Sequence, residues 1–434
     1  MRVVDLIART RDGGRLTREE IDQLVAGVTA GAIPEYQTAA WLMAVVWRGL
    51  DADETAWLTE AMVRSGQRID LSAIAGPTVG KHSTGGVGDK LSLIVVPIVA
   101  ACGGRVLKTS GRALGHSGGT IDKLEAIAGF RVDLPMAECL AVVAEIGCAF
   151  VGQTADIAPA DKKLYALRDV TGTIESVPLI ASSIMSKKIA EGASALVLDV
   201  KVGRGAFMKS LPDARRLSEV MVAIGRDVGL PTRAVLTAMD APLGRAVGNA
   251  LEVAEAVATL KGTGPADVTG LSVALASHML LAAGLAADAA SAEARVVDAI
   301  ASGAAYSVFE AVVSRQGGDA SGLERIAEVS AAPVQEVVVA SRSGCIAGID
   351  AERIGRASMM LGAGRERLDT PIHYGAGIVI DALPGADVQA GQPLATLHAG
   401  RPERLDEARA LVEQAFEIAL SAPPALPLVY DVIA

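Results

Sequence analysis

Apolar residues near the start of the chain recur with helical spacing. The stretch 21–28 carries them at i, i+3, i+4 and i+7, and Thr17 with Glu20 three residues later forms a capping-box pattern ahead of it. Asp51 and Glu54 repeat this signal before a second apolar stripe. The spacing therefore predicts a small bundle of helices up to about residue 64, with the apolar stripes forming its core.

The pattern changes near Gly66, where glycine-rich loops begin to alternate with short apolar runs. These runs predict strands at 105–107, 149–151 and 195–200, and helical patterns lie at 136–146, 182–191, 206–229, 251–260 and 272–287. Strands that alternate with helices favour an α/β domain. The apolar run that begins at Leu91 has no clear period and contains Pro97, so helix and strand both remain open there.

From about Ser341 the chain predicts short strands, at 348–349, 378–380 and 394–397, punctuated by Gly, Pro and Asp. Residues 385–399 have a G-x-x-V-x-x-G-x-x-L rhythm that is typical of half a lipoyl- or biotinyl-like sandwich. A carrier domain would need a lysine in an exposed hairpin turn, and no lysine follows Lys261. We therefore expect a small accessory β domain without chemistry of its own.

Composition narrows the class of protein. The 434 residues are 51% hydrophobic with 46 glycines, as in a globular chain. The net charge of −10 argues against a nucleic-acid binder but leaves room for a local basic pocket. No apolar stretch reaches the roughly 18 residues of a membrane span, and no secretory signal opens the sequence. With four scattered cysteines, we expect a cytoplasmic protein with free thiols and no membrane or nucleic-acid partner.

The densest chemical signal is KHSTGGVGDK, which spans residues 81–90. Three glycines within four positions let the backbone turn tightly, and successive N–H groups in such a turn can bind an anion. Lys81 adds a positive charge, and Ser83 and Thr84 add hydroxyl donors. The Walker pattern is absent, so the segment predicts a phosphate loop of another kind.

A second glycine- and hydroxyl-rich loop, KTSGRALGHSGGTIDKLE, spans residues 108–125 between a predicted strand and a predicted helix. Ligands of α/β sheets bind at such carboxyl ends of strands. Ser110 and Thr120 could each donate a hydrogen bond to an oxyanion. Two such loops predict one phosphate held between them.

A third signal combines LYALRDVT at 164–171 with SSIMSKK at 182–188. Ser183 and Lys187 are four residues apart and would share one helix face. The planar guanidinium of Arg168 can bind a planar ligand that carries carbonyl groups. Taken alone, each of these cations is more often a solvated surface charge.

In this order, the three blocks resemble the thymidine/pyrimidine-nucleoside phosphorylase family. SGRALGHSGGTIDKLE fits the family's signature stretch with Ala113 and Ser117 as mild variants, and the resemblance extends from the N-terminal helices to the C-terminal domain. It implies an α/β protein in three parts. A small all-α domain would comprise residues 1–65 and 163–193, and a large α/β phosphate-binding domain residues 80–154 and 197–335. Residues 341–434 would form a C-terminal α+β, barrel-sandwich-like accessory domain.

The resemblance also implies roles for individual residues. Phosphate would be bound by Lys81, Ser83, Ser92, Lys108, Ser110 and Thr120. The pyrimidine would be bound by Tyr165, Arg168, Ser183, Lys187 and Phe207. His82 would lie between the two groups, as a general acid or a hydrogen-bond donor to the base, and would share the catalysis with Arg168 and Lys187.

The implied reaction is phosphorolysis, in which phosphate attacks C1′ of a pyrimidine nucleoside from the face opposite the base. The products would be the free base and α-(deoxy)ribose 1-phosphate. Inorganic phosphate would be a co-substrate, and no metal or organic cofactor would be required. The family is typically a homodimer whose domains close on the substrates, and we place the dimer contact on the N-terminal helices.

Two lysines separate branches of the family. Some members hold a monovalent cation at positions matching Gly88, Leu243, Ala246 and Glu255, and at a threonine that is Lys90 here. We expect the Lys90 ammonium to replace the cation and to pair with Glu255. Lys108, where the thymidine-restricted branch has methionine, favours acceptance of uridine as well as thymidine and deoxyuridine.

Three alternatives stay open at this point. The first is a phosphorylase restricted to thymidine and deoxyuridine. The second is an anthranilate-type phosphoribosyltransferase, which would need Mg²⁺ held by acidic residues. The third is a nucleoside- or phosphate-binding regulator without catalysis, which phosphate-dependent turnover would exclude.

Overall fold

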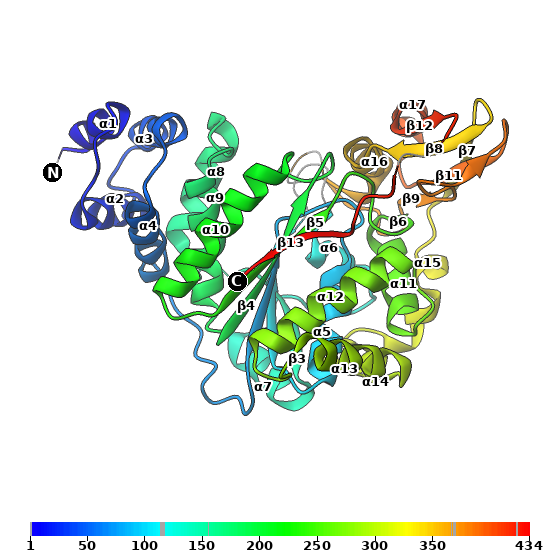
Figure 1. Ribbon diagram of the computed structural model, residues 1–434, viewed down its shortest axis with the longest axis horizontal. Coiled ribbons are helices and arrows are strands. Elements are labelled where there is room, and N and C mark those ends of the chain that lie inside the picture. Colours follow the sequence, from blue (N-terminus) through cyan, green and yellow to red (C-terminus); the bar gives the residue numbers. More distant parts are fainter. Residues whose placement is uncertain (1, 113–117, 155, 366, 368–369, 422–423) are drawn as a thin grey trace.

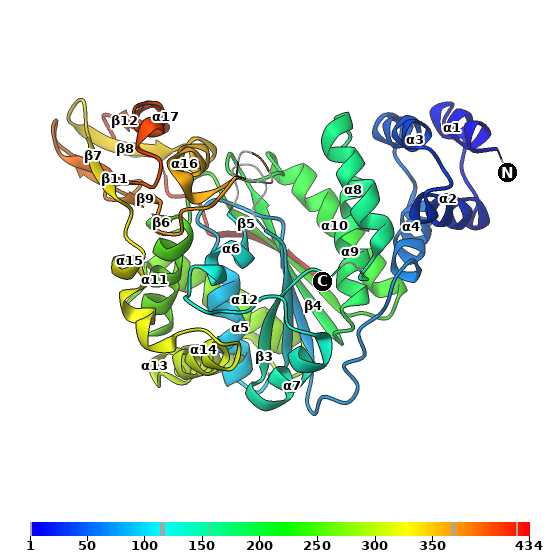
Figure 2. The same ribbon diagram turned by 180° about the vertical axis from the view of Figure 1, so that it is seen from behind.

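The computed structural model describes residues 2–112, 118–154, 156–365, 367, 370–421 and 424–434. Figures 1 and 2 show a helical N-terminal part and a strand-containing C-terminal part on opposite sides of a large α/β part. The predicted fold class, an α/β protein with a small all-α part and a C-terminal α+β part, is confirmed.

The helical part consists of α1 (Val3–Arg11), α2 (Arg18–Ala30), α3 (Glu35–Arg48) and α4 (Ala52–Arg64), joined by α8 (Pro159–Thr171) and α9 (Val177–Ala190). The capping boxes predicted at Thr17 and Asp51 are both present. Trp41 from α3, Leu164 from α8 and Leu179 from α9 are buried in one apolar core. Two distant segments of the chain therefore form one helical unit, and α8 and α9 are its contribution to the site described below.

The central sheet has the strand order β1 (Val79–Ser83), β4 (Ala195–Val202), β5 (Thr232–Ala238) and β13 (Val429–Ile433). The first three strands are parallel, with Ser83 opposite Asp199, whereas β13 runs antiparallel to β5. A parallel pair of β2 (Val106–Ser110) and β3 (Cys148–Gly152) lies beside β1. This arrangement brings the carboxyl ends of β1 and β2, and the loops that follow them, close together.

The strands predicted at 105–107, 149–151 and 195–200 are confirmed as β2, β3 and β4, each extending further at its carboxyl end, although β2 begins one residue later than predicted. Residues 108–110, expected in the second glycine-rich loop, therefore lie on β2. Lys81–Ser83, expected to lie in a glycine-rich loop, instead form the end of β1, and the loop begins at Thr84. Charged and polar residues within this buried strand conceal its apolar pattern. The helix predicted at 206–229 begins only at Leu211 as α10 (Leu211–Asp227), because Ser210 caps it.

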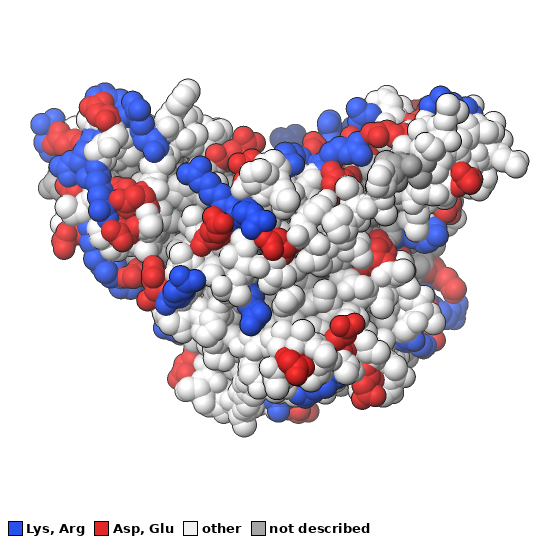
Figure 3. Space-filling view, in the orientation of Figure 1, with Lys and Arg blue, Asp and Glu red and all other residues white. Residues whose placement is uncertain are grey.

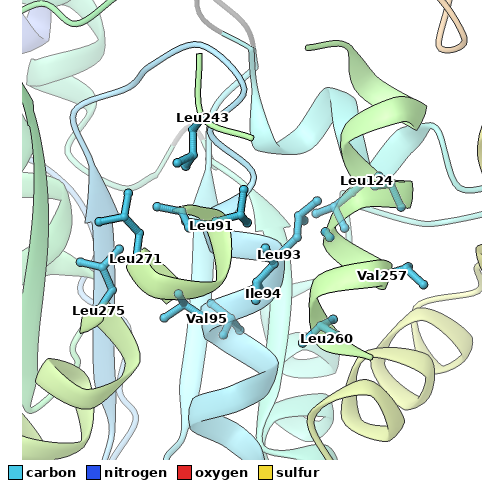
Figure 4. Close-up of a cluster of buried hydrophobic side chains, with 14 of the residues drawn as sticks. Leu91, Leu93, Ile94, Val95, Leu124, Leu243, Val257, Leu260, Leu271 and Leu275 are labelled. Atoms are coloured by element: carbon cyan, nitrogen blue, oxygen red, sulfur yellow. The ribbon is translucent and has the colours of Figure 1, made fainter. Parts of the chain in front are cut away.

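The apolar run that begins at Leu91 forms helix α5 (Leu91–Ala101), although Pro97 lies inside it. Figure 4 shows Leu91 and Val95 of this helix among leucines of α12 (Ala266–Ala282) and near α11 (Asn249–Leu260). A helix enclosed on every side needs no polar face, which explains the missing period. This part also contains helices α6 (Thr120–Glu125), α7 (Met136–Ile146), α13 (Ala289–Ala301), α14 (Ala304–Arg315) and α15 (Ile326–Val329).

The C-terminal part contains two small sheets. One has the strand order β10 (Asp387–Val388), β8 (Gly344–Ile349) and β12 (Phe416–Ala419). The other has the order β6 (Ala246–Val247), β9 (Gly377–Ile380), β11 (Pro393–Ala399) and β7 (Val334–Val339). Helices α16 (Ala351–Ser358) and α17 (Leu405–Ala415) pack together beside the sheets. Because β6 belongs to the α/β part of the chain, the second sheet joins the two parts.

On the face seen in Figure 3, acidic and basic side chains are interspersed around a hollow between the helical and C-terminal parts. Among the described residues, no single helix is long and apolar enough to cross a membrane. Helices α13 and α14 meet the length and composition criteria only as a pair, which is bent by 65°.

Candidate active site

The residues predicted to bind phosphate lie around the carboxyl ends of β1 and β2. Lys81 is buried on β1, and its Nζ donates a hydrogen bond of 3.3 Å to Oγ of Ser92. Ser92 lies in the first turn of α5, and the N-terminus of a helix favours an anion. The structure therefore brings this lysine, this serine and a helix N-terminus together.

A buried network of opposite charges supports Lys81. Its ammonium is 3.6 Å from the carboxylate of Asp199, and Lys201 is 2.9 Å from the same oxygen. Ser83 donates a hydrogen bond of 2.5 Å to Asp89. Burial opposes the charge of Asp89, but nearby lysines, Lys201 and Lys81 foremost, hold the pKa of this carboxyl well below its usual range. The network keeps both phosphate-side groups of β1 in fixed positions.

The segment predicted as the second loop contributes Lys108 and Ser110, which lie on β2, and Thr120 of α6. Lys108 is buried on β2, and burial together with the neighbouring charge of Lys188 lowers its pKa well below the usual value. The Oγ of Ser110 is buried and has no hydrogen-bond partner among the described residues. Thr120 begins α6, and residues 113–117 of the motif lie outside the described part of the chain. An anion placed here would favour the charged form of the lysine.

A cavity of about 570 Å³ lies beside these loops. Its wall contains His82 and every residue predicted to bind the pyrimidine: Tyr165, Arg168, Ser183, Lys187 and Phe207. Helix α8 supplies the tyrosine and arginine, α9 the serine and lysine, and the segment after β4 the phenylalanine, which is 42% exposed. Of the residues predicted to bind phosphate, Ser83 also lines the cavity, so the two groups meet on β1.

Lys187 has a partner that the sequence patterns do not reveal. Its Nζ donates hydrogen bonds to Ser183 at 3.0 Å and to Oδ2 of Asp161, which also lines the cavity. The other carboxylate oxygen of Asp161 is buried and has no hydrogen-bond partner among the described residues. Helical spacing from Tyr165 and Arg168, at i+4 and i+7, is the signal that places Asp161 on their face of α8.

Arg168 is almost completely buried, and burial lowers its pKa. Its guanidinium donates to the backbone carbonyls of Thr173, Leu179 and Ile174 at 3.1, 3.0 and 2.5 Å. These bonds use three of its five N–H groups, and its Cζ lies 5.8 Å from the centre of the Tyr165 ring. The arginine is thus rigidly held in the cavity wall.

His82 lies where the two groups of residues meet. Burial, and then the charges of Lys188, Lys108, Lys187 and Lys81, lower its pKa well below 6.5. The imidazole is therefore neutral at pH 7, which favours hydrogen-bond donation over transfer of a proton from an imidazolium. Glu191 and Thr109 are also buried in this environment. The carboxylate of Glu191 accepts hydrogen bonds from Lys188 and from the hydroxyl of Thr109.

Lys90 lies outside the cavity in a nest of oxygen atoms. Its Nζ donates to the carbonyls of Leu243 and Ala246 at 2.8 and 3.0 Å and to Glu255 at 2.5 Å. The predicted pairing with Glu255 is confirmed. A side chain at Gly88, whose φ is +71°, would come within 2.6 Å of the Leu243 carbonyl. Because the ammonium uses these oxygens, the residues present do not fit the monovalent cation that the resemblance implies.

Within the described residues, no group of three or more His, Cys, Asp or Glu side chains is arranged to hold a metal ion. The chemistry that the site offers is electrostatic: lysines, hydroxyls and N–H groups for a phosphate, with an arginine and a lysine across the cavity wall. Such donors stabilise negative charge on an attacking anion and on a leaving group.

Three family models match the chain. Two describe a glycosyl transferase family, with its helical bundle domain at residues 4–66 and its a/b domain at 75–306, and the third is the pyrimidine nucleoside phosphorylase C-terminal domain at 345–419. The fold and site thus define a glycosyl transferase with an additional C-terminal domain. Anthranilate phosphoribosyltransferase from Thermus thermophilus has a similar fold, with a TM-score of 0.59 at 22% identity over 71% of this chain and 98% of its own.

Pyrimidine-nucleoside phosphorylases from Staphylococcus epidermidis and Staphylococcus aureus are 49% and 50% identical to the chain over 403 residues, which is 93% of this chain and 93% of each relative. The chain belongs to the pyrimidine-nucleoside phosphorylase family. The resemblance carried by the three sequence blocks is confirmed.

Proposed function

We propose that this protein catalyses the reversible phosphorolysis of pyrimidine nucleosides, as a pentosyltransferase in pyrimidine salvage. The observation that carries the proposal is the meeting of two sets of groups on β1. Lys81 belongs to a lysine- and hydroxyl-rich anion site, and His82 and Ser83 line the adjacent cavity with Arg168 and Lys187. The two staphylococcal relatives, both pyrimidine-nucleoside phosphorylases by name, support the same activity.

In the proposed mechanism, phosphate held by Lys81, Ser83, Ser92, Lys108, Ser110 and Thr120 attacks C1′ while the bond from C1′ to the base breaks. The departing pyrimidine takes the bonding electrons. Arg168 and Lys187 stabilise the charge that grows on its carbonyl oxygens, and neutral His82 donates a hydrogen bond to one of them. No metal or organic cofactor takes part, and exclusion of water from the cavity protects C1′ from hydrolysis.

The experiment follows release of free base by absorbance from thymidine and from uridine, with and without inorganic phosphate, in the presence of EDTA. Phosphate-dependent release from both nucleosides is expected. Release from thymidine alone would assign the restricted branch and contradict the inference from Lys108. No release of base, or, in a separate assay with Mg²⁺, turnover only of a pyrophosphorylated sugar with loss of pyrophosphate, would refute the phosphorylase assignment.

We also propose that the enzyme is a cytoplasmic homodimer that pairs through the helical part. Tyr36, Met43 and Trp47 lie on one face of α3 at spacings of seven and four residues and are 74%, 38% and 81% exposed. A continuous apolar stripe in water favours a second copy of the same surface. The four free cysteines are compatible with a reducing compartment.

Light scattering after size-exclusion chromatography tests this surface. Trp47→Glu should convert the dimer to a monomer, whereas Val337→Glu, at a half-exposed valine of β7, should not. A native monomer, or a dimer unaffected by Trp47→Glu, would refute the assignment.

A further inference from the structure

One arginine of the C-terminal part, Arg365, contacts helix α6 of the α/β part. Arg365 follows the helical turn Met359–Ala363, and its Nη1 donates a hydrogen bond of 2.7 Å to Oδ1 of Asp122 on α6. The side chain of Asp122 is fully buried, and that of Arg365 is 18% exposed. A charge-assisted bond in such a place fixes the relative position of the two parts.

Asp122 and its neighbour on α6, Glu125, also bind a residue of the cavity wall. Arg112 lines the cavity, and its Nη1 lies 3.3 Å from Asp122 while its Nη2 donates to Glu125 at 2.7 Å. Tyr374, also from the C-terminal part, donates its hydroxyl to Glu125 at 3.4 Å. Two residues of the C-terminal part and one residue of the cavity thus share two carboxylates.

The segment that carries Arg365 and Tyr374 is itself anchored on the α/β part. Nδ2 of Asn249, the first residue of α11, donates to the carbonyl of Ala363 at 2.8 Å. The backbone N–H of Ala250 donates to the carbonyl of Tyr374 at 2.9 Å. The arginine therefore projects from a fixed base, so its side chain can brace α6.

We propose that Arg365 is a positioning residue for phosphorolysis: through Asp122 it holds α6 and Arg112, and so sets the positions of Thr120, at the start of α6, and of Ser110, two residues before Arg112. This inference rests on the proposed function. Among the described residues, the guanidinium groups of Arg112 and Arg365 both pair with the buried carboxylate of Asp122, and loss of one partner of a buried charge is costly. Arg112 would then move toward Asp122 and away from Glu125. Residues 345–419 match the pyrimidine nucleoside phosphorylase C-terminal domain, and Arg365 gives this region a role in catalysis.

Arg365→Gln should raise the KM for phosphate about tenfold, because misplacement of a binding group by about 1 Å costs up to 100-fold. The Arg365→Lys variant keeps the charge and should recover most of the loss. The matched control is Arg353→Gln, which also removes an arginine of the C-terminal part, paired with Asp350 at 3.4 Å, and should leave the KM for phosphate unchanged. Circular dichroism melts establish that all variants are folded.

A double-mutant cycle with Asp122→Asn tests the route of the effect. If Arg365 acts through Asp122, adding Arg365→Gln to Asp122→Asn should change the KM no further. Additive losses, or an Arg365→Gln variant that matches native kinetics, would overturn the inference. Calorimetric titration with inorganic phosphate compares the dissociation constants of the native protein and the variants without any turnover. A native protein that releases no base but binds phosphate would refute the proposed function, while unequal phosphate affinities of native and variant would still uphold the bracing role.

Discussion

Replacement of Lys90 by threonine is expected to make the stability of the protein depend on potassium. The Lys90 ammonium is completely buried and donates to two carbonyls and to Glu255. Removing one partner of a buried ion pair costs about 3–5 kcal/mol. The shorter side chain leaves the oxygens of Leu243, Ala246 and Glu255 to face a space that an ion could enter.

The magnitude of the recovery follows from linkage. A ligand at 100 times its dissociation constant stabilises the folded state by about 2.7 kcal/mol, so saturating potassium should restore most of the lost free energy of unfolding. Urea unfolding, followed by circular dichroism, is measured in potassium chloride and in tetramethylammonium chloride of equal ionic strength. The native protein should unfold at the same urea concentration in both salts.

The matched control is Lys90→Met, which removes the charge without adding an oxygen ligand and should be destabilised in both salts. Potassium-dependent stability or activity of the native protein would refute the reasoning, because the ammonium would then not occupy the cation position. So would a Lys90→Thr variant as stable as the native protein in the salt that lacks potassium.

Three further predictions concern the site. Lys108→Met should lower turnover of uridine more than of thymidine, and equal losses in parallel assays would contradict the sugar assignment. Asp161→Asn, which removes the charged partner of Lys187, should lower kcat/KM for the nucleoside about tenfold or more while the KM for phosphate changes less than about twofold; equal shifts of both constants would refute it. Because the folded state depresses the pKa of His82, stability due to this group is present above pH 6.5 and falls by up to about 1.4 kcal/mol per pH unit below it. Urea unfolding at pH 5.5 and 7.5 should show a smaller difference for His82→Gln than for the native protein, and an unchanged difference would exclude this origin.

Local signals allowed the sequence to predict part of the fold. The capping boxes at Thr17 and Asp51 and the apolar residues 195–198 at the start of β4 depend on neighbouring residues only, and each is confirmed. Strand β1 could not be predicted from its pattern because a buried lysine interrupts its apolar residues. Helix α5 could not be predicted because it is enclosed by other helices and lacks the polar face that gives a helix its period.

The residues of the candidate site likewise fall into those that the sequence predicted and those that only the structure reveals. The motifs named Lys81, His82, Arg168 and Lys187 directly, and the structure gathers them around one cavity and its adjoining loops. Helical spacing along α8 could have placed Asp161, the partner of Lys187, beside Tyr165 and Arg168, but no spacing along the chain reveals the partner of Lys81. Asp199 reaches Lys81 only because β4 pairs with β1 in a particular register. The assigned roles in binding and catalysis remain predictions for the assays above.

The pairing of β13 with β5 has a consequence for biosynthesis. Strand β5 forms within the α/β part, but the strand that covers its edge is encoded far downstream, beyond the whole C-terminal part. A nascent chain therefore carries an uncovered sheet edge while the intervening residues are translated, and such edges pair readily with other chains. An affinity tag fused directly after Ile433 would crowd this closing strand, so a recombinant form is better tagged beside α1.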